Sequence, residues 1–542
     1  MCLEWEVQVR FPSDTPVAGV ELNPWVRVNY KGAYLSPPNY AVHFTWYREL
    51  STSSKYVQNY VALQYHAARS NSTTSSGNEL KQEKLGLVNS EDSQIIEGEG
   101  KTWIKVGHSR TYIPSQDDID SSLRLVSFAT NDMGMRMSPI NVFVTTPVIR
   151  LPRPCPRRMV LLCSLRNLRY PNFTAKPFKD ESFRVLSYNI LADLYTIRDA
   201  YSHCPKWALT WEYRRRNLLN EMLSYDADIL CLQEVQSDHF KNFFEPEFTK
   251  LGYSAVYKRK TKEVYCANQY VIDGCATFFR QDRFKMVTKY EVEYDKMALP
   301  VIEILEPDTR NDGIFRLMKD NVALVVILEE KDNGHCQDGV RSRICVANTH
   351  IHCGSDASDV RLFQVVNLIR GLEKIDSSGI PILVCGVMNS LPGSDPHRFL
   401  INGEVGCFNE KYRDPLGIHK HLKLSHSMHL ASAYAQLLDS NEVGQHQKEK
   451  MDHQTLEPLF TCFRPSFSRT LDYILYSKNR LKVDGLLELL DYDSLENRLL
   501  PSPLWSSDHV ALMANFRVKR SSRRAKYLSP PPDPWEQKQT EV

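Results

Sequence analysis

The sequence predicts a layered α/β domain that is preceded by a smaller all-β domain. The chain has 542 residues, which is long enough for two or more domains and a large buried core. The first 150 residues alternate polar and apolar side chains with the period of two that is typical of half-buried strands. From residue 181 onward, short apolar strands alternate with helical or irregular stretches, which is typical of layered α/β domains.

The β-rich half, residues 1–150, contains six alternating segments that are separated by turn residues. They are EWEVQVRF, WVRVNY, AVHFTWYREL, TWIKVGHS, SLRLVSFAT and INVFVTT. Short alternating strands of this kind favour a small β-sandwich, and the immunoglobulin-like arrangement is the nearest known example.

Three further segments follow along the chain. Residues 151–180 are rich in proline and basic residues, and they predict a linker. Residues 181–518 form the predicted α/β domain, with the strands RVLSYNIL, DILCLQEV, GCATFFR, ALVVILEE, ICVANTHI, ILVCGVMN, LDYILYS and ALMANF. Residues 519–542 are basic and then proline-rich, and this composition predicts a disordered tail.

Composition narrows the class of protein. The formal net charge of +2 excludes a global polycation, so contact with nucleic acid would need a local basic surface or a metal site. The thirteen cysteines never form a Cys-x-x-Cys pair, which argues against a zinc ribbon or a redox motif. The longest apolar run, MVLLCSL, is too short to span a bilayer, and the N-terminus does not resemble a signal peptide. We therefore expect a soluble intracellular protein of the cytoplasm. The basic segment KRSSRRAK is either a nuclear import signal, which adds the nucleus, or a solvated basic tail.

Polar residues recur where the predicted strands end. They are Asn189, Glu234, Asn348, His350, Asn389, Asp472, Asp508 and His509. Singly, a glutamate at a strand end is usually solvated, and an Asp-His pair usually caps a helix. Together they would form one polar cluster at one edge of the sheets, and burying such a cluster without a function is costly.

Phosphodiester cleavage needs such a set of side chains. It uses a carboxylate for a divalent metal, amides that orient phosphate oxygens, and a His–Asp pair that stabilises developing charge. Glu234 is the candidate carboxylate. Mg²⁺ keeps several of its waters, so one or two protein carboxylates are enough to bind it.

The motifs SYNILAD, DILCLQEV, DGCATFFR, KDNVALVVILE, VANTH, PILVCG-x-x-NS, TLDYILYS and PSPLWSSDHVALMANF resemble the plant branch of the carbon catabolite repressor protein four deadenylases. The resemblance covers nearly all of residues 183–516, and the motifs occur in the same order. In the β-rich half, TWIKVGHSRTYIPSQDDI is similar to the same branch.

The resemblance implies a four-layer αββα sandwich of the exonuclease–endonuclease–phosphatase type. It also implies an Mg²⁺-dependent 3′→5′ poly(A) exoribonuclease, with Mn²⁺ as the alternative metal, that acts within the carbon catabolite repressor–Not complex.

The resemblance also implies a role for each site residue. Glu234 would bind the metal, and Asp472 would support the metal site. Asp508 would orient His509, which would stabilise the transition state. The residues expected to bind the substrate are Asn189, Asn348, His350 and Asn389, together with Phe467, which would stack on an adenine.

The sequence departs from the family at the segment Gly386-Val387-Met388-Asn389-Ser390, where the family has an aspartate at the position of Val387. That aspartate would contact the attacking water, and valine cannot accept a proton or orient a water. In addition, the chain has no cysteine between Cys2 and Cys155 and no leucine-rich repeat. Both features serve docking in relatives, so docking to the complex is in doubt.

Three functions remain open from the sequence. The first is a deadenylase impaired by Val387. The second is a catalytically inactive paralogue that binds RNA or protein partners. The third is another phosphoesterase of the same superfamily that acts on lipid or nucleotide phosphates.

Overall fold

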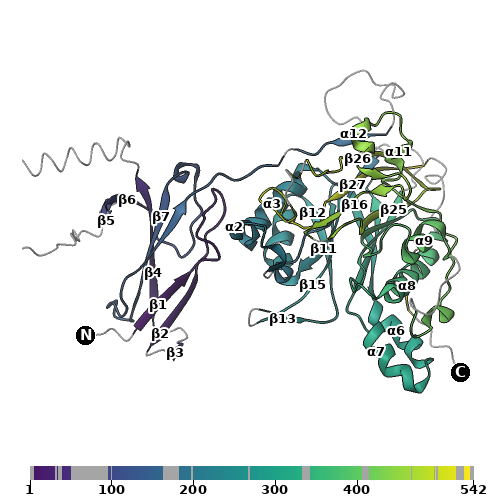
Figure 1. The fold of residues 1–542 in the computed structure, drawn as a ribbon, viewed down its shortest axis with the longest axis horizontal. Coiled ribbons are helices and arrows are strands. Elements are labelled where there is room, and N and C mark those ends of the chain that lie inside the picture. Colours follow the sequence, from purple (N-terminus) through teal and green to yellow (C-terminus); the bar gives the residue numbers. More distant parts are fainter. Residues whose placement is uncertain are drawn as a thin grey trace, which may run out of the picture. The chain divides into compact units, whose positions relative to one another are not determined.

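The computed structural model describes residues 5–30, 33–34, 40–50, 95–98, 100–154, 156–162, 182–196, 199–266, 269–331, 342–405, 414–465, 467–493, 495, 499–519, 530 and 532–536 (Figure 1). The chain divides into two compact units. One comprises Met1–Arg153 with Pro205–Arg216, and the other comprises Pro154–Cys204 with Asn217–Val542.

The first unit is built from two antiparallel sheets. One has the order β1-β2-β3, with β1 Trp5–Arg10, β2 Trp25–Tyr30 and β3 Ala33–Tyr34. The other has the order β5-β6-β4-β7-β8, with β4 Ala41–Leu50, β5 Ile95–Gly98, β6 Lys101–Gly107, β7 Ser122–Thr130 and β8 Asn141–Pro147. This arrangement confirms the all-β domain that the alternating sequence predicts.

The core of this unit joins the two sheets. Val7 of β1 and Val28 of β2 pack against Ala129 of β7. Trp46 is fully buried in β4 and stacks on Tyr112, with ring centroids 5.5 Å apart. A buried tryptophan in a central strand is also a feature of immunoglobulin-type sandwiches.

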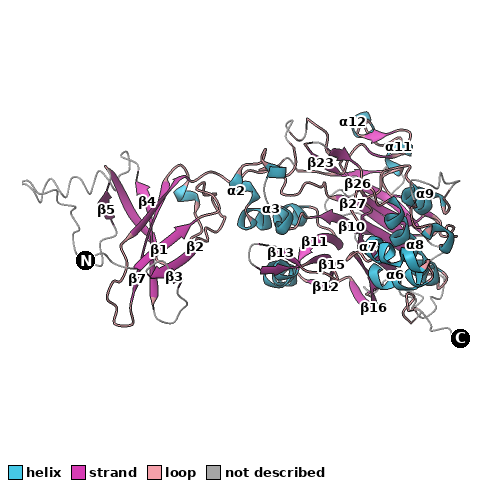
Figure 2. Ribbon diagram, turned by 60° about the horizontal axis from the view of Figure 1, so that its bottom comes forward, coloured by secondary structure: helices cyan, strands magenta, loops and turns pink. Residues whose placement is uncertain are grey.

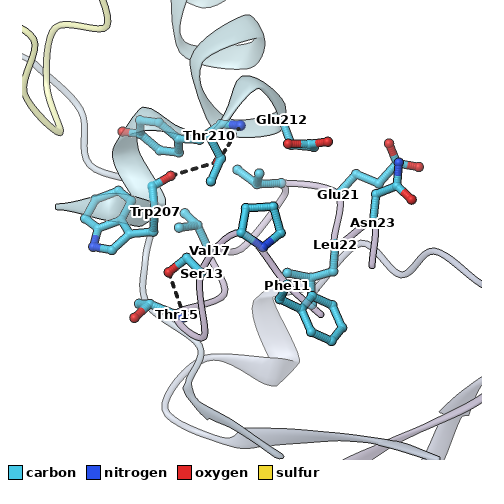
Figure 3. Close-up of a pocket in the computed structure, with 13 residues that line it drawn as sticks. Phe11, Ser13, Thr15, Val17, Glu21, Leu22, Asn23, Trp207, Thr210 and Glu212 are labelled. Carbon is cyan, nitrogen blue, oxygen red and sulfur yellow. Dashed lines mark hydrogen bonds between the residues drawn. The ribbon is translucent and has the colours of Figure 1, made fainter. Parts of the chain in front are cut away.

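A small pocket lies within the first unit (Figure 3). It is lined by residues 11–23 and by side chains that include Trp207, Thr210 and Tyr213. Its lining includes Glu21, Asn23 and Glu212 but no histidine. The pocket therefore lacks the His–Asp pair that the predicted chemistry requires.

The second unit contains two large mixed sheets. The seven-stranded sheet has the order β12-β15-β11-β10-β27-β26-β9, with β9 Met159–Leu161, β10 Ser182–Asn189, β11 Ile229–Gln236, β12 Tyr253–Arg259, β15 Asp273–Arg280, β26 Leu481–Leu487 and β27 Leu512–Val518. The six-stranded sheet has the order β16-β17-β18-β19-β25-β20, with β16 Phe284–Glu293, β17 Val322–Glu330, β18 Arg343–His350, β19 Ile382–Val387, β20 Leu430–Ser432 and β25 Asp472–Ser477. Three short hairpins accompany them: β13 Val264–Cys266 with β14 Gln269–Val271, β21 Met451–Asp452 with β22 Glu457–Pro458, and β23 Cys462–Arg464 with β24 Phe467–Arg469.

Helices cover the outer face of each sheet in the second unit. The α-helices among the described residues are α2 Lys206–Leu209, which belongs to the first unit, α3 Trp211–Ser224, α4 Ser237–His239, α5 Glu245–Lys250, α6 Tyr294–Glu303, α7 Arg310–Leu317, α8 Ser358–Asp376, α9 Asp395–Asn402, α11 Gln436–Asp439 and α12 Gln445–Lys448. Figure 2 shows α6 to α9 gathered on one side of the strands. On the seven-stranded sheet, Phe248 of α5 packs against Phe278 of β15, and Glu221 of α3 accepts a hydrogen bond from Tyr188 of β10.

One apolar core fills the space between the sheets, and another lies between the six-stranded sheet and α8. The first includes Val185 and Ile229 of one sheet with Val326 of the other. The second includes Leu372 of α8 and Val325. The result is the four-layer αββα sandwich that the resemblance implies. Of the helices within the described residues, none is both long and apolar enough to cross a membrane.

Two segments differ from the predicted linker and tail. Within residues 151–180, β9 extends the seven-stranded sheet, and the buried Arg157 donates hydrogen bonds to the carbonyls of Glu488 and Ala511. Within residues 519–542, Trp535 is buried against α8, and its Nε1 donates to the carbonyl of Asn367 at 3.0 Å. Both segments contain apolar side chains, in β9 and at Trp535. Burial of these side chains stabilises an ordered conformation although the surrounding composition is polar.

Candidate active site

The strand ends that carry the predicted polar residues meet at one edge of the second unit. In the six-stranded sheet, His350 at the end of β18 is paired with Val387 at the end of β19. Val387 is paired in turn with Asp472 at the start of β25. In the seven-stranded sheet, Asn189 ends β10 beside Gln233 of the parallel strand β11, directly before Glu234. Neighbouring strands therefore supply the site.

Glu234 lies in an irregular part of β11. The pairing of β11 with β15 shifts between Leu232 and Val235, and Glu234 has a φ of +56°. A left-handed conformation is costly for a residue other than glycine, and such strain is often found at functional sites. It turns the side chain so that Oε1 accepts a hydrogen bond from Nδ2 of Asn189 at 2.9 Å, while Oε2 accepts one from the backbone N–H of Ala192 at 3.0 Å.

The electrostatic surroundings of Glu234 favour a cation. Burial raises the pKa of its carboxyl group, and the carboxylates of Asp508 and Asp273 raise it further, whereas Lys260 and Asn189 lower it. Buried carboxylates that repel one another are stabilised as anions by a bound cation. The site therefore favours a metal ion near Glu234 and Asp508.

Asp508 provides the second carboxylate. Its Oδ2 accepts a hydrogen bond from the hydroxyl of Tyr201 at 2.9 Å and forms an ion pair with Nε of Arg464 at 2.6 Å. Its Oδ1 is buried and has no hydrogen-bond partner among the described residues. An unpaired buried oxygen beside a second carboxylate fits Mg²⁺, which prefers oxygen ligands and retains several waters.

His509 forms a pair with Asp472. Its Nδ1 lies 2.7 Å from Oδ2 of Asp472, which also accepts a hydrogen bond from the hydroxyl of Thr461 at 2.6 Å. Burial opposes the charged imidazole, but the negative charge of Asp472 outweighs it and holds the pKa of His509 well above its usual range. The side chain can therefore carry a positive charge into the site.

The implied roles of the two aspartates are exchanged in the structure. We expected Asp508 to orient His509 and Asp472 to support the metal. Instead, Asp472 holds His509, and Asp508 shares its surroundings with Glu234. Asp508 and His509 are consecutive, and successive side chains of extended backbone point in opposite directions, so Asp508 cannot easily hold the neighbouring ring.

His350 and Asn389 complete the polar cluster. Burial lowers the pKa of His350 well below its usual value, and the charges of Lys260 and His509 lower it further, so the imidazole is neutral. Its Nδ1 lies 4.0 Å from Oε1 of Glu234 and has no hydrogen-bond partner among the described residues. Asn389 has a φ of +47°, and its Nδ2 donates to the carbonyl of Ile351 at 2.7 Å.

The side chain of Val387 is 1% exposed and packs against Cys462 and Leu471. This apolar cluster of Val387, Cys462 and Leu471 borders the polar site. Potential metal-binding atoms of Cys462, Asp508 and His509 lie within 4.8 Å of one another. Cys462 and His509 would suit a softer metal than Mg²⁺, but Nδ1 of His509 is already bonded to Asp472. The side chains of Val387 and Leu471 cannot accept or donate a proton, so they cannot replace the aspartate that the family has at position 387.

Asn348 is a correction to the expected substrate-binding set. It is fully buried, and its Nδ2 donates to the carbonyls of Leu232 at 3.1 Å and Ala276 at 2.9 Å. Its Oδ1 accepts a hydrogen bond from Nε2 of Gln233 at 2.8 Å. These bonds link the two sheets and satisfy the amide, so Asn348 has a structural position rather than one open to substrate.

Phe467 is 39% exposed on the β23–β24 hairpin, where it is paired with Arg464. The ring is therefore not part of the core and is available for stacking. Its side chain is not buried against the metal-site residues.

Three polar residues of the site were missed from the sequence. They are Tyr201, Asp273 and Arg464. Nζ of Lys260 lies 2.9 Å from Oδ2 of Asp273, and both charges act on Glu234. The signal for Asp273 was its place at the start of the strand DGCATFFR. No local pattern indicated Tyr201 or Arg464, because their partner Asp508 is remote in sequence.

The chain is similar in sequence to several known proteins. A family model for the Endonuclease/Exonuclease/phosphatase family matches residues 186–509, which include every site residue from Asn189 to His509. The chain is 46% identical over 439 residues to Carbon catabolite repressor protein 4 homolog 1 of Arabidopsis thaliana, covering 79% of this chain and 73% of that protein. It is 33% identical over 374 residues to the CCR4-Not complex 3'-5'-exoribonuclease subunit Ccr4 of Mycosarcoma maydis, covering 63% and 51%. The crystal structure of ANGEL2, a 2',3'-cyclic phosphatase, in complex with adenosine-2',3'-vanadate aligns with a TM-score of 0.49 and 30% identity, covering 62% of this chain and 96% of that chain.

Proposed function

The chain belongs to the endonuclease/exonuclease/phosphatase family and, within it, to the carbon catabolite repressor protein 4 homologues, and from this premise we propose that it is a 3′→5′ poly(A) exoribonuclease slowed by Val387. The observation that carries the proposal is that the buried carboxylates of Glu234 and Asp508 act on one another electrostatically and that Asp508 directly precedes His509, which is bonded to Asp472. Two acidic oxygen donors next to a charged imidazole suit the hydrolysis of a phosphodiester.

Each side chain has a separate task in this proposal. Glu234 and Asp508 would hold Mg²⁺ or Mn²⁺, which would neutralise charge on the phosphate when bound. The amides of Asn189 and Asn389 and the neutral imidazole of His350 orient phosphate oxygens. The two amides are already held in place, since Asn189 is bonded to Glu234 and Asn389 to the carbonyl of Ile351.

His509 acts on the charge that develops during cleavage. Asp472 holds its Nδ1 and keeps the ring protonated, so the opposite nitrogen is free to donate to a phosphate oxygen. A fixed charge in a buried site stabilises an anionic transition state strongly, because no solvent has to reorganise.

The presence of valine at position 387 determines the rate of RNA cleavage that we expect. A carboxylate that positions or deprotonates the attacking water contributes on the order of 10²–10⁴ in rate. The apolar side chains of Val387 and Leu471 cannot replace it. The alternative function, an inactive paralogue that binds RNA or partners, is favoured by the same observation together with the guanidinium of Arg464 on Asp508.

The proposed partners are poly(A) RNA and the carbon catabolite repressor–Not complex. The Mycosarcoma maydis relative is named as a subunit of that complex. We expect a weak interaction with the complex's second deadenylase subunit, because this chain has neither a cysteine-rich finger nor leucine-rich repeats.

A gel assay on 5′-labelled oligo(A), with Mg²⁺ or with chelator, separates the candidate functions. Slow shortening from the 3′ end that needs Mg²⁺ supports the exoribonuclease. Binding without cleavage supports the inactive paralogue. Indifference to RNA, with hydrolysis of nucleotide or lipid phosphates, would show that the chain is another phosphoesterase.

A further inference from the structure

We propose that the hairpin formed by β13 and β14 is a stacking platform for the bases of single-stranded RNA that extends from the active site; this inference rests on the proposed function. The hairpin forms a two-stranded sheet of its own, and Figure 1 shows β13 projecting beyond the strands that lead into it. We define its two strands, residues 264–266 and 269–271, as the tyrosine hairpin.

Two tyrosines face solvent on this hairpin. Tyr265 and Tyr270 are register partners, and they are 63% and 72% exposed. Their ring centroids are 5.2 Å apart, with an angle of 58° between the ring planes. A lone two-stranded hairpin is marginally stable, and exposed rings add little burial to it. A pair of exposed aromatic rings on one projecting face therefore suggests binding rather than packing.

The hairpin starts and ends at the active site. Its two arms leave the seven-stranded sheet at Lys260 and Asp273, where the N–H of Lys260 donates to the carbonyl of Asp273 at 2.9 Å. The side chains of these two residues are paired, and both charges act on Glu234. Tyr270 lies three positions before Asp273, a path of about 10 Å along a strand. The rings thus lie within a few nucleotides of the residues that border the metal site.

The charges on the first arm fit a phosphate backbone. Arg259 is exposed and only loosely paired, with its Nη1 4.0 Å from Oε1 of Glu263. Lys262 is exposed as well. Cations that follow the backbone, combined with rings that stack on bases, are the usual means of binding single strands without sequence preference. The hairpin would therefore hold the RNA, while selection for adenine would depend on other contacts.

The test measures binding of a fluorescent 20-nucleotide oligo(A) to the full chain by anisotropy, in chelator so that cleavage is absent. We expect Tyr265→Ala with Tyr270→Ala to weaken binding at least about fivefold, since each lost stack typically weakens binding between fivefold and a hundredfold. Replacing both tyrosines by tryptophan should keep the affinity, whereas replacing both by leucine should not, because leucine preserves apolar bulk without a π face.

The matched control is Phe315→Ala, which removes an aromatic ring that is 84% exposed on α7 and should leave the affinity unchanged. Thermal melting of every variant checks folding, and the tryptophan and leucine pairs decide the question if the alanine pair fails to fold. If the double leucine variant binds oligo(A) as well as the parent chain, the hairpin is not a stacking platform, while the proposed function is unaffected. If the parent chain itself does not bind oligo(A), both are wrong. An equal loss of affinity for double-stranded RNA would also contradict stacking on single strands.

Discussion

Glu234 combines three properties that single out a metal ligand: backbone strain, burial and like-charged neighbours. The conformation with a φ of +56° is unfavourable for glutamate, and the hydrogen bonds from Asn189 and Ala192 keep the side chain in place. Such a residue has little value for stability alone, since Asp508 and Asp273 disfavour its charged form. Cation binding is the simplest reason for this arrangement.

Removing this carboxylate should abolish the response to Mg²⁺. Mg²⁺ at ten times its dissociation constant stabilises the folded chain by about 1.4 kcal/mol, which raises the melting temperature. We expect Glu234→Ala to lose this shift in a melting experiment with and without Mg²⁺. Glu329→Ala, which removes a carboxylate paired with Arg343, should keep it. An unchanged shift in Glu234→Ala would mean that the metal binds elsewhere.

Arg464 supplies a positive charge at the same place. Its guanidinium lies 2.6 Å from Asp508, and the negative charge of Glu234 also acts on it. We expect Arg464→Met to raise the apparent affinity for Mg²⁺ by at most about fivefold, because a partly exposed pair contributes about 0.2–1 kcal/mol. Arg464→Lys, which keeps the charge, is the control. A Mg²⁺ titration by thermal shift measures both, and lower affinity in Arg464→Met would contradict competition.

Val387 offers the sharpest test of the chemistry. Val387→Asp should speed the shortening of oligo(A) by at least about two orders of magnitude. RNA affinity should change little, because the new carboxylate acts mainly in the transition state. Packing against Cys462 and Leu471 will raise the pKa of the new group by burial. The rescue should therefore improve as the pH rises.

The control is Val387→Asn, which fits the same space and cannot take up a proton. It should not rescue cleavage in the same gel assay. Rapid cleavage by the parent chain, without further gain in Val387→Asp, would show that another group positions the water.

At the scale of the elements, β19 has to pass very close to β18 for His350 and Val387 to align. Gly386 allows this approach. It has a φ of +134°, and a Cβ at this position would lie 2.0 Å from the carbonyl oxygen of Thr349. A glycine is therefore required at position 386 for β18 and β19 to bring His350 and Val387 together.

The C-terminal segment adds an element-scale contact on α8. A Cβ at Gly371 would lie 2.0 Å from the ring of Trp535, so glycine leaves the space that the indole fills. We expect Trp535→Ala to lower the free energy of unfolding by about 3 kcal/mol, the low end of the range for buried aromatic residues. Chemical denaturation measures the loss. Trp25→Ala, at a half-exposed position, should cost less than about 1 kcal/mol. Similar losses for the two variants would argue that Trp535 does not dock in solution.

At the scale of the whole molecule, the chain should separate between its two units. We expect limited proteolysis to cut first between residues 151 and 180 and to leave a stable C-terminal fragment. Because β9 and Arg157 belong to the seven-stranded sheet, a fragment that keeps this sheet intact should begin before Arg157. Mass spectrometry of the fragments identifies the cut. First cuts within residues 190–510 would contradict this division.

The sequence by itself determined the architecture and the location of the site. Period-two alternation predicts the β-rich first unit, and alternating strands and helices predict the layered second unit. Polar residues at strand ends indicate which side chains gather at one edge, since side-chain direction along a strand follows from local geometry. Glu234, His350, Asp472 and His509 could be selected in this way because each directly follows or opens an apolar run.

The tertiary structure alone decided which of these side chains bind one another. His509 takes Asp472, 37 residues away, rather than its neighbour Asp508. Asn348 turns inward to link the sheets, while Arg464 and Tyr201 reach Asp508 from remote segments. Such partners depend on how the two sheets and the connecting loops pack. Sequence periodicity describes which face a residue occupies, but it contains no information about which distant residue lies opposite.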